Sequence, residues 1–206
     1  MAQARSPKPR HCAHRARPGG RRVLARTLWL ANLCADVIDP APFGGASRLR
    51  PDLEDLPSFA FGDGPALANR LAALVVAGRK TGTCWSAKEG EKNVRPGARW
   101  IVLNGEGRAV CLLETVALET FRFHEATPLH ARMEGEGDLS LAYWQRAHED
   151  YFCKNGGFTP DMPLYYETFR LVETLDQAFV GTAPLQLAAE IAEAAQAGFV
   201  MPASLI

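Results

Sequence analysis

The sequence has few of the features that would assign it at once to a class of protein. It contains five cysteines, an odd count, and no two of them form a Cys-x-x-Cys pair. These spacings argue against a structural zinc site and a disulfide framework, and they predict a reduced, cytoplasmic protein. There is no Gly-rich phosphate-binding loop and no internal repeat. Nothing in the sequence therefore indicates a nucleotide, haem, flavin or metal cofactor.

Net charge is also absent, because 23 Lys and Arg balance 23 Asp and Glu. Residues 1–50 hold ten basic and two acidic side chains, so residues 51–206 hold the remaining 13 basic and 21 acidic ones, a formal charge of −8. A broad surface that follows a phosphate backbone needs clustered positive charge. We expect the acidic part to use a small local pocket if it binds nucleic acid, and its charge favours a small neutral substrate over long RNA.

Acidic residues are missing from residues 1–26, which are rich in Arg, Pro and Gly. Such a composition buries too little apolar surface to fold, and it predicts a disordered basic extension. Three interpretations stay open: a nucleic-acid-binding arm, a transit peptide, and an extension without function. His11, Cys12 and His14 are close enough in sequence to bind a metal adventitiously, but a second pair of ligands for a structural zinc site is missing.

A hydrophobic run long enough to cross a membrane is missing as well. The most apolar stretch of the first part, residues 23–38, is short and contains Arg26 and Asp36, so it predicts an amphipathic helix and not a membrane span. A Pro/Gly-rich connector follows over residues 39–58. The predicted divisions are the extension at 1–26, a helix and connector at 27–58, a folded domain at 59–174, and a C-terminal extension with one helix at 175–206.

The clearest pattern that is present lies in residues 59–86. Asp63 and Pro65 are typical of a helix start, and the apolar residues that follow have helical spacing. Gly78 is expected to end this helix in the left-handed conformation, and residues 81–86 predict a strand. Arg79 and Lys80 occupy the junction between helix and strand. This junction is the first place to expect a chemical site, because free backbone groups and basic side chains meet there.

The rest of the chain predicts more strands than helices. Strands are expected at residues 100–103 and 109–118, joined by a turn at 104–107, and at 163–172. Residues 121–133 have a mixed pattern whose first residues are compatible with a short strand. Asp138 is expected to cap a helix with Trp144 and His148 on its buried face, and an Ala-rich helix is expected from Pro184 to residue 197. Hairpins dominate, so the prediction is an α+β fold, a small mixed β-barrel with flanking helices.

Four ordered blocks resemble the ASCH domain, the activating-signal-cointegrator homology group of the PUA-like superfamily. They span residues 61–83, 97–116, 134–152 and 163–172, and together cover about residues 59–173. The resemblance implies a PUA-like barrel with a cleft for RNA or a modified nucleoside. Some members of the family remove the acetyl group from 4-acetylcytidine, others are ribonucleases, and many have no known reaction. A fold hosts many functions, so the resemblance is more specific for the fold than for the reaction.

The resemblance also implies site residues. In the amidohydrolase type a Lys and a Thr of one motif act with a Glu. Lys80 and Thr83 correspond to the first two, and the Glu is one of Glu134 and Glu136, with Glu136 preferred because it is beside the expected helix cap. The residues expected to bind substrate, with no metal and no cofactor implied, are Arg79, Thr81, Trp85, Glu134 and Glu167.

Elementary chemistry limits what these residues can do. A threonine hydroxyl needs an adjacent base to act as a nucleophile. Lys80 is a base only if its pKa falls toward neutral; Arg79 would lower that pKa and Glu136 would raise it, and the sequence leaves the balance open. Lys80 and Thr83 are three positions apart, so in a regular strand their side chains would face opposite sides of the sheet. They meet only if Lys80 precedes the strand. Glu136 is a candidate general acid–base, or an acceptor for the exocyclic amine of cytosine.

Ordinary structural explanations stand beside these roles. A basic pair at a helix end stabilises the helix dipole, and acids before a helix are often a solvated turn. Trp144 and His148 are expected to pack in the core, Trp85 to lie open for base stacking, and Glu167 to pair with Lys80 or Arg79. The leading hypothesis is a nucleoside or RNA-base pocket with metal-independent amide hydrolysis. The alternatives are a non-catalytic RNA-binding module and a ribonuclease.

Overall fold

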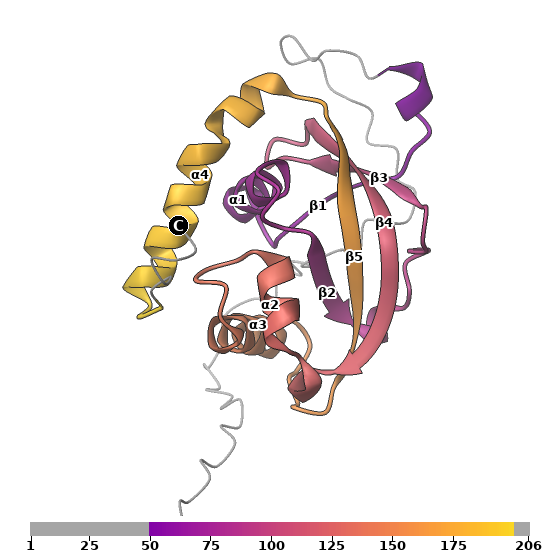
Figure 1. Cartoon of the computed structure of the whole chain (residues 1–206). Helices are drawn as coiled ribbons and strands as arrows, with labels where there is room; N and C mark the ends of the chain where they lie inside the picture. Colours follow the sequence, from indigo (N-terminus) through magenta and orange to yellow (C-terminus); the bar gives the residue numbers. More distant parts are fainter. Residues whose placement is uncertain (1–49, 200–206) are drawn as a thin grey trace, which may run out of the picture.

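A curled five-stranded sheet forms the centre of the computed structural model, which describes residues 50–199 (Figure 1). The strand order is β1-β3-β4-β5-β2. Strand β1 is parallel to β3, and the other neighbouring strands are antiparallel. The predicted α+β fold with a mixed, barrel-like sheet is confirmed. The strands are β1 (Ser58–Ala60), β2 (Gly82–Ser86), β3 (Arg99–Leu103), β4 (Ala109–Arg122) and β5 (Pro163–Thr174).

Within residues 50–199, four α-helices lie on one side of this half-barrel (Figure 1). Helix α1 lies between α4 and the sheet, and α2 and α3 pack together beside β2 (Figure 1). The helices are α1 (Pro65–Val76), α2 (Pro128–Glu134), α3 (Leu141–Asn155) and α4 (Gln177–Gln196). The predicted extension at residues 1–26, most of the predicted segment 27–58, and the His11, Cys12 and His14 group lie outside the described residues.

Helix α1 forms where the apolar spacing predicts it. Leu71, Leu74 and Val75 are buried against the sheet and α4. The helix begins at Pro65 with Gly64 at the N-cap and no capping side chain, so the expected Asp63 cap is wrong. Gly78 has a φ of 71°, the left-handed conformation that ends a helix and that glycine adopts without strain.

The region between β4 and α3 differs from the prediction. Strand β4 pairs with β5 as far as Arg122, four residues beyond the expected end. Helix α2, which the mixed pattern of residues 121–133 did not predict, follows and ends at Glu134. Helix α3 is capped by Ser140, whose hydroxyl accepts from the Tyr143 N–H, and not by Asp138, which accepts from the N–H of Ser140.

Helix α4 begins seven residues before the predicted start at Pro184. Asp176 caps it by accepting a hydrogen bond of 2.9 Å from the Phe179 N–H. Pro184 lies inside the helix, although proline is most favourable in the first turn. Phe179 and Ala183 belong to the core cluster of α1. Tertiary packing of this early segment thus extends the helix through a residue that usually marks its start.

The cysteines within residues 50–199 are two buried thiols and a bonded one. Cys84 and Cys111 are free and buried, which confirms their prediction as small core residues. Cys153 is disulfide-bonded, so the expectation of a chain without disulfides is wrong at this position.

Within residues 50–199, no helix is both long and apolar enough to cross a membrane.

Candidate functional site

The junction after α1 is joined to the end of α2. The Thr81 N–H donates to the Met133 carbonyl oxygen at 2.7 Å, and the Thr81 hydroxyl donates to the same oxygen at 3.3 Å. Gly135 has a φ of 73°, and a Cβ atom there would collide with the Arg79 carbonyl oxygen. Because only glycine allows this close approach, the two segments meet and bring both glutamates of residues 134–136 to Lys80.

Lys80, Glu134 and Glu136 form an ammonium–carboxylate cluster. Lys80 Nζ lies 2.7 Å from Glu136 Oε1, 3.2 Å from Glu134 Oε2 and 3.3 Å from the Glu134 carbonyl oxygen. These acceptors match the three N–H groups of a lysine. The side chains of Lys80 and Glu134 are 1% exposed, whereas that of Glu136 is 18% exposed. Glu136 is therefore the member of the cluster that reaches the surface.

The two carboxylates decide the charge of Lys80. Burial by itself would lower the pKa of Lys80, but Glu136 and Glu134 raise it well above its ordinary value. Burial would likewise raise the pKa of Glu134, while Lys80, His148 and Trp144 lower it to about 2. The effect of the two carboxylates thus outweighs that of burial, a comparison that the sequence left open. Lys80 is an ammonium and does not have the pKa of a general base. The burial of Glu134 also shows that the acids are not merely a solvated turn.

Thr83 belongs to a different part of the site. Successive residues of β2 face opposite sides of the sheet, so Cys84 packs against α2 and α3 while Thr83 faces an aromatic hollow. Lys80 does precede the strand, yet within the described residues no hydrogen bond joins the Thr83 hydroxyl to Lys80 or Glu136. The aromatic hollow is lined by Phe59, Thr83, Trp85, Lys92, Val94, Trp100 and Glu167.

Glu167 is buried in the aromatic hollow, where its carboxylate is bonded to a hydroxyl group. Its Oε1 accepts a hydrogen bond of 2.6 Å from the Thr115 hydroxyl, which in turn accepts one of 3.3 Å from Trp100 Nε1. No ion pair joins Glu167 to Lys80 or Arg79 in the part of the chain that the structure describes, so the expected pairing is wrong. Burial raises the pKa of Glu167 to about 7, against the opposing effect of the Thr115 hydrogen bond.

This raised pKa predicts a pH dependence of stability. The folded state holds a proton that the unfolded state releases above pH 4.5, so the free energy of unfolding should fall as pH rises from 4.5 through about 7. The predicted loss is about 3 kcal/mol. Glu167→Gln stays uncharged at every pH. In urea denaturation, the free energy of unfolding of this variant relative to wild type should therefore increase from pH 5 to pH 8. A difference that does not change with pH would contradict the raised pKa.

Trp85 is buried and not open as expected. Its side chain donates from Nε1 to the Gly90 carbonyl oxygen at 2.8 Å, and its ring stacks on Tyr165. The short 3-10 turn Ala87–Glu89 directly after β2 brings Gly90 back to this ring. Trp85 is therefore a wall of the aromatic hollow and has only 2% of its surface exposed.

Arg79 holds the loop that follows Glu136. Its Nη2 donates to the Gly137 carbonyl oxygen at 2.5 Å. From the other side, Glu190 of α4 accepts from the Gly137 N–H at 2.8 Å and lies 3.7 Å from Arg70 Nε. The sequence did not point to Glu190, because its acidic side chain in an Ala-rich helix looks like an exposed one.

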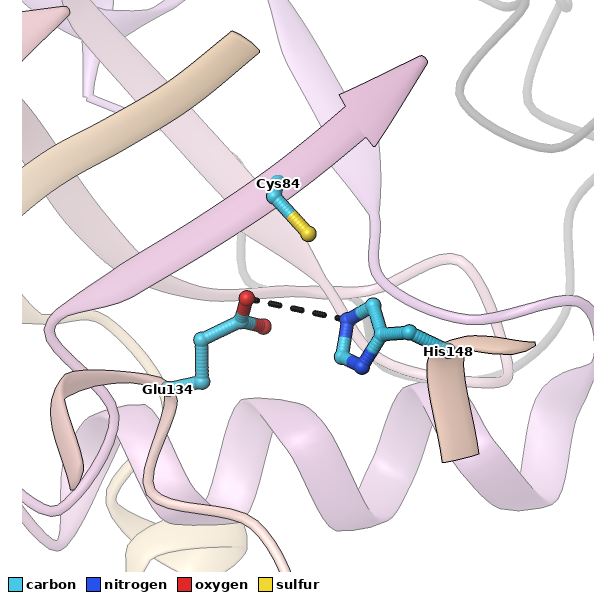
Figure 2. Close-up of side chains that lie close together, drawn as sticks. All are labelled: Cys84, Glu134 and His148. Carbon is cyan, nitrogen blue, oxygen red and sulfur yellow. Dashed lines mark ion pairs between the residues drawn. The ribbon is translucent and has the colours of Figure 1, made fainter. Parts of the chain in front are cut away.

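A second group that the sequence did not bring together borders the ammonium–carboxylate cluster. Cys84, Glu134 and His148 point toward one another from β2, α2 and α3 (Figure 2). One ligand atom of each lies within 4.8 Å of the others. Trp144 is in the core as predicted, and His148 stacks on its ring.

Comparisons with known proteins agree with this fold. A family model of the ASCH domain matches residues 57–173, which is more than half of the chain, and the protein therefore belongs to the ASCH domain family. This match confirms the resemblance seen in the sequence. A search of curated proteins finds no match.

Two solved structures are similar to this chain. The ASCH domain from Lactobacillus crispatus JV V101 is 29% identical, with a TM-score of 0.54 over 56% of this chain and 79% of that one. A protein from Enterococcus faecalis V583 is 31% identical, with a TM-score of 0.52 over 57% of this chain and 77% of that one. The ASCH, PUA-like fold is common to them and to this protein.

Proposed function

We propose that this protein binds a nucleoside or RNA base and hydrolyses an amide on it, as in 4-acetylcytidine, without a metal. One observation carries the proposal: the partly exposed carboxylate of Glu136 is held at 2.7 Å by the buried ammonium of Lys80. A fixed carboxylate at the edge of a protein is suited to general acid–base chemistry, since its position is set before the substrate arrives.

Glu136 is the proposed catalytic residue. It takes a proton from a water molecule, whose oxygen attacks the acetyl carbonyl carbon. The tetrahedral intermediate then breaks its C–N bond, and the proton passes from Glu136 to the departing exocyclic nitrogen. The products are acetate and cytidine. Lys80 is a positioning residue in this scheme, because its three N–H groups are already occupied by Glu134 and Glu136.

The aromatic hollow is proposed to admit the edge of the base. Phe59, Trp85 and Trp100 form apolar walls, and Thr83 and Glu167 offer polar groups. Its volume of about 20 Å³ holds little more than one water molecule, so a whole ring enters only when these walls move apart. Among residues 50–199 no base is hydrogen-bonded to the Thr83 hydroxyl, which favours a substrate contact over the nucleophilic role implied by the resemblance. The formal charge of −8 on residues 51–206 supports a neutral nucleoside over long RNA.

The test is turnover of 4-acetylcytidine by the purified full chain in EDTA, followed by chromatography of cytidine and acetate. We expect equal amounts of both products and a rate that changes little between 50 and 200 mM salt, because a neutral nucleoside releases no counterions. Absence of turnover would reject the hydrolytic proposal. Short RNA that binds, with an affinity that falls steeply with salt, would then indicate an RNA-binding module, and its cleavage would indicate a ribonuclease.

A further inference from the structure

Three different metal-binding side chains converge on the helical side of β2. The Cys84 thiol comes from the strand, the Glu134 carboxylate from the end of α2, and the His148 imidazole from the middle of α3 (Figure 2). Their ligand atoms lie within 4.8 Å of one another, and His148 Nε2 is 3.6 Å from Glu134 Oε1. Cys84 belongs to the core cluster behind the sheet, and Glu134 is buried beside it, where an unbalanced set of polar side chains is costly.

We propose that Cys84 Sγ, Glu134 Oε1 and His148 Nε2 bind one zinc ion. Thiolate, carboxylate and imidazole are the three kinds of ligand that zinc takes in proteins, at about 2.0–2.3 Å. In a tetrahedral site such bonds set the ligand atoms about 3.3–3.8 Å apart, which small side-chain rotations reach from the observed spacing. Magnesium and calcium fit poorly, because they prefer oxygen ligands and one of these ligands is sulfur.

The neighbouring groups orient the ligands. His148 Nδ1 lies 3.0 Å from the Trp144 carbonyl oxygen. A carbonyl only accepts, so Nδ1 carries a proton, and Nε2 is the ring nitrogen that faces Glu134 and is left to take the ion. A second ring nitrogen bonded to a carbonyl is the usual support of a metal-binding histidine. Glu134 Oε1 accepts from Trp144 Nε1 at 2.8 Å and keeps a further lone pair for an ion.

The charges also permit a cation here. The ammonium of Lys80, the carboxylates of Glu134 and Glu136, the Cys84 thiolate and a divalent ion sum to zero, once the thiol proton and any proton on His148 Nε2 have passed to solvent. Lys80 contacts Oε2 of Glu134, the oxygen that the ion does not use.

The zinc site shares Glu134 with the ammonium–carboxylate cluster, but it uses neither of the proposed hydrolytic residues as a ligand. Neither Lys80 nor Glu136 is a ligand, so metal binding and 4-acetylcytidine turnover can fail independently. Three protein ligands leave one coordination position for a water molecule. The His148 side chain is 13% exposed and provides the route from solvent.

Cobalt(II) titration of the EDTA-treated full chain tests the proposal, because tetrahedral cobalt bound to a thiolate has characteristic visible and near-ultraviolet absorption. We expect one equivalent to give both bands. Cys84→Ser should lose the thiolate band. Cys111→Ser is the matched control, since Cys111 is the other buried free thiol and packs in the separate α1 cluster. It should keep the band.

Two further variants keep the result decisive. A variant with His11→Ala, Cys12→Ser and His14→Ala must retain the band, which separates the proposed site from that sequence group. His148→Gln, altered at a partly exposed position, should fold and lose the tetrahedral spectrum even if Cys84→Ser does not fold. Zinc should raise the Tm of wild type and Cys111→Ser but not that of His148→Gln. The proposal is overturned if wild type shows no thiolate band, if Cys84→Ser keeps it, or if the N-terminal variant abolishes it.

Discussion

Replacing Lys80 with methionine is expected to lower the free energy of unfolding by about 3–5 kcal/mol. The methionine fills much of the same space, but it leaves the carboxylate of Glu134 buried with no cation at Oε2. A buried charge that loses its partner costs far more than the net value of the pair. Chemical denaturation at pH 7 measures the change directly.

Two companion variants isolate this cause. Lys88→Met removes a lysine from an exposed position nearby and should change stability by less than about 0.5 kcal/mol. The double variant Lys80→Met with Glu134→Gln removes the charge that Lys80 compensates, so it should recover part of the lost stability. If Lys80→Met were as stable as Lys88→Met, the cluster would not be the buried ion pair described here.

Replacing Glu136 with glutamine is expected to lower kcat for 4-acetylcytidine hydrolysis by about 10²–10⁴-fold. The amide keeps the shape of the side chain and can still accept from Lys80, but it cannot take a proton from water. Stability should change much less than in Lys80→Met, because Lys80 keeps its two contacts with Glu134. Steady-state kinetics and a denaturation curve on the same sample separate the two effects.

Glu106→Gln is the control for this variant. Glu106 is exposed in the turn between β3 and β4, so the same chemical change there should leave kcat unchanged. Retention of wild-type kcat by Glu136→Gln would remove Glu136 from the general-base role, even if 4-acetylcytidine is a substrate.

Much of the fold follows from local pattern. The apolar spacing of α1, the left-handed Gly78 and the alternation in β5 are properties of short segments, so the sequence predicts them well. The errors occur where distant packing overrides a local signal. Pro184 is a strong start signal, yet α4 begins earlier because Asp176 caps it and Phe179 packs on the core.

The candidate site is less predictable for the same reason. The resemblance to the ASCH domain pointed to Lys80, Thr83 and Glu136, and the structure joins only Lys80 and Glu136 directly. Two predictions about the neighbouring residues were wrong. Trp85 is not open, because the turn that follows β2 covers it, and Glu167 does not have the predicted partner, because it is bonded to Thr115 of β4. The local sequence around Trp85 or Glu167 contains no pattern that predicts either of these contacts.

The sequence by itself determined the family, the α+β class and the position of the basic junction between α1 and β2. Only the tertiary structure decided that Lys80 is a buried ammonium, that Glu136 is its partly exposed partner, and that Glu134 is close to both Cys84 and His148. Element type depends on neighbouring residues, whereas charge state and convergence depend on burial and on distance in space. Lys80 and Glu134 are 54 residues apart in the chain, and they meet only when α2 packs against the start of β2.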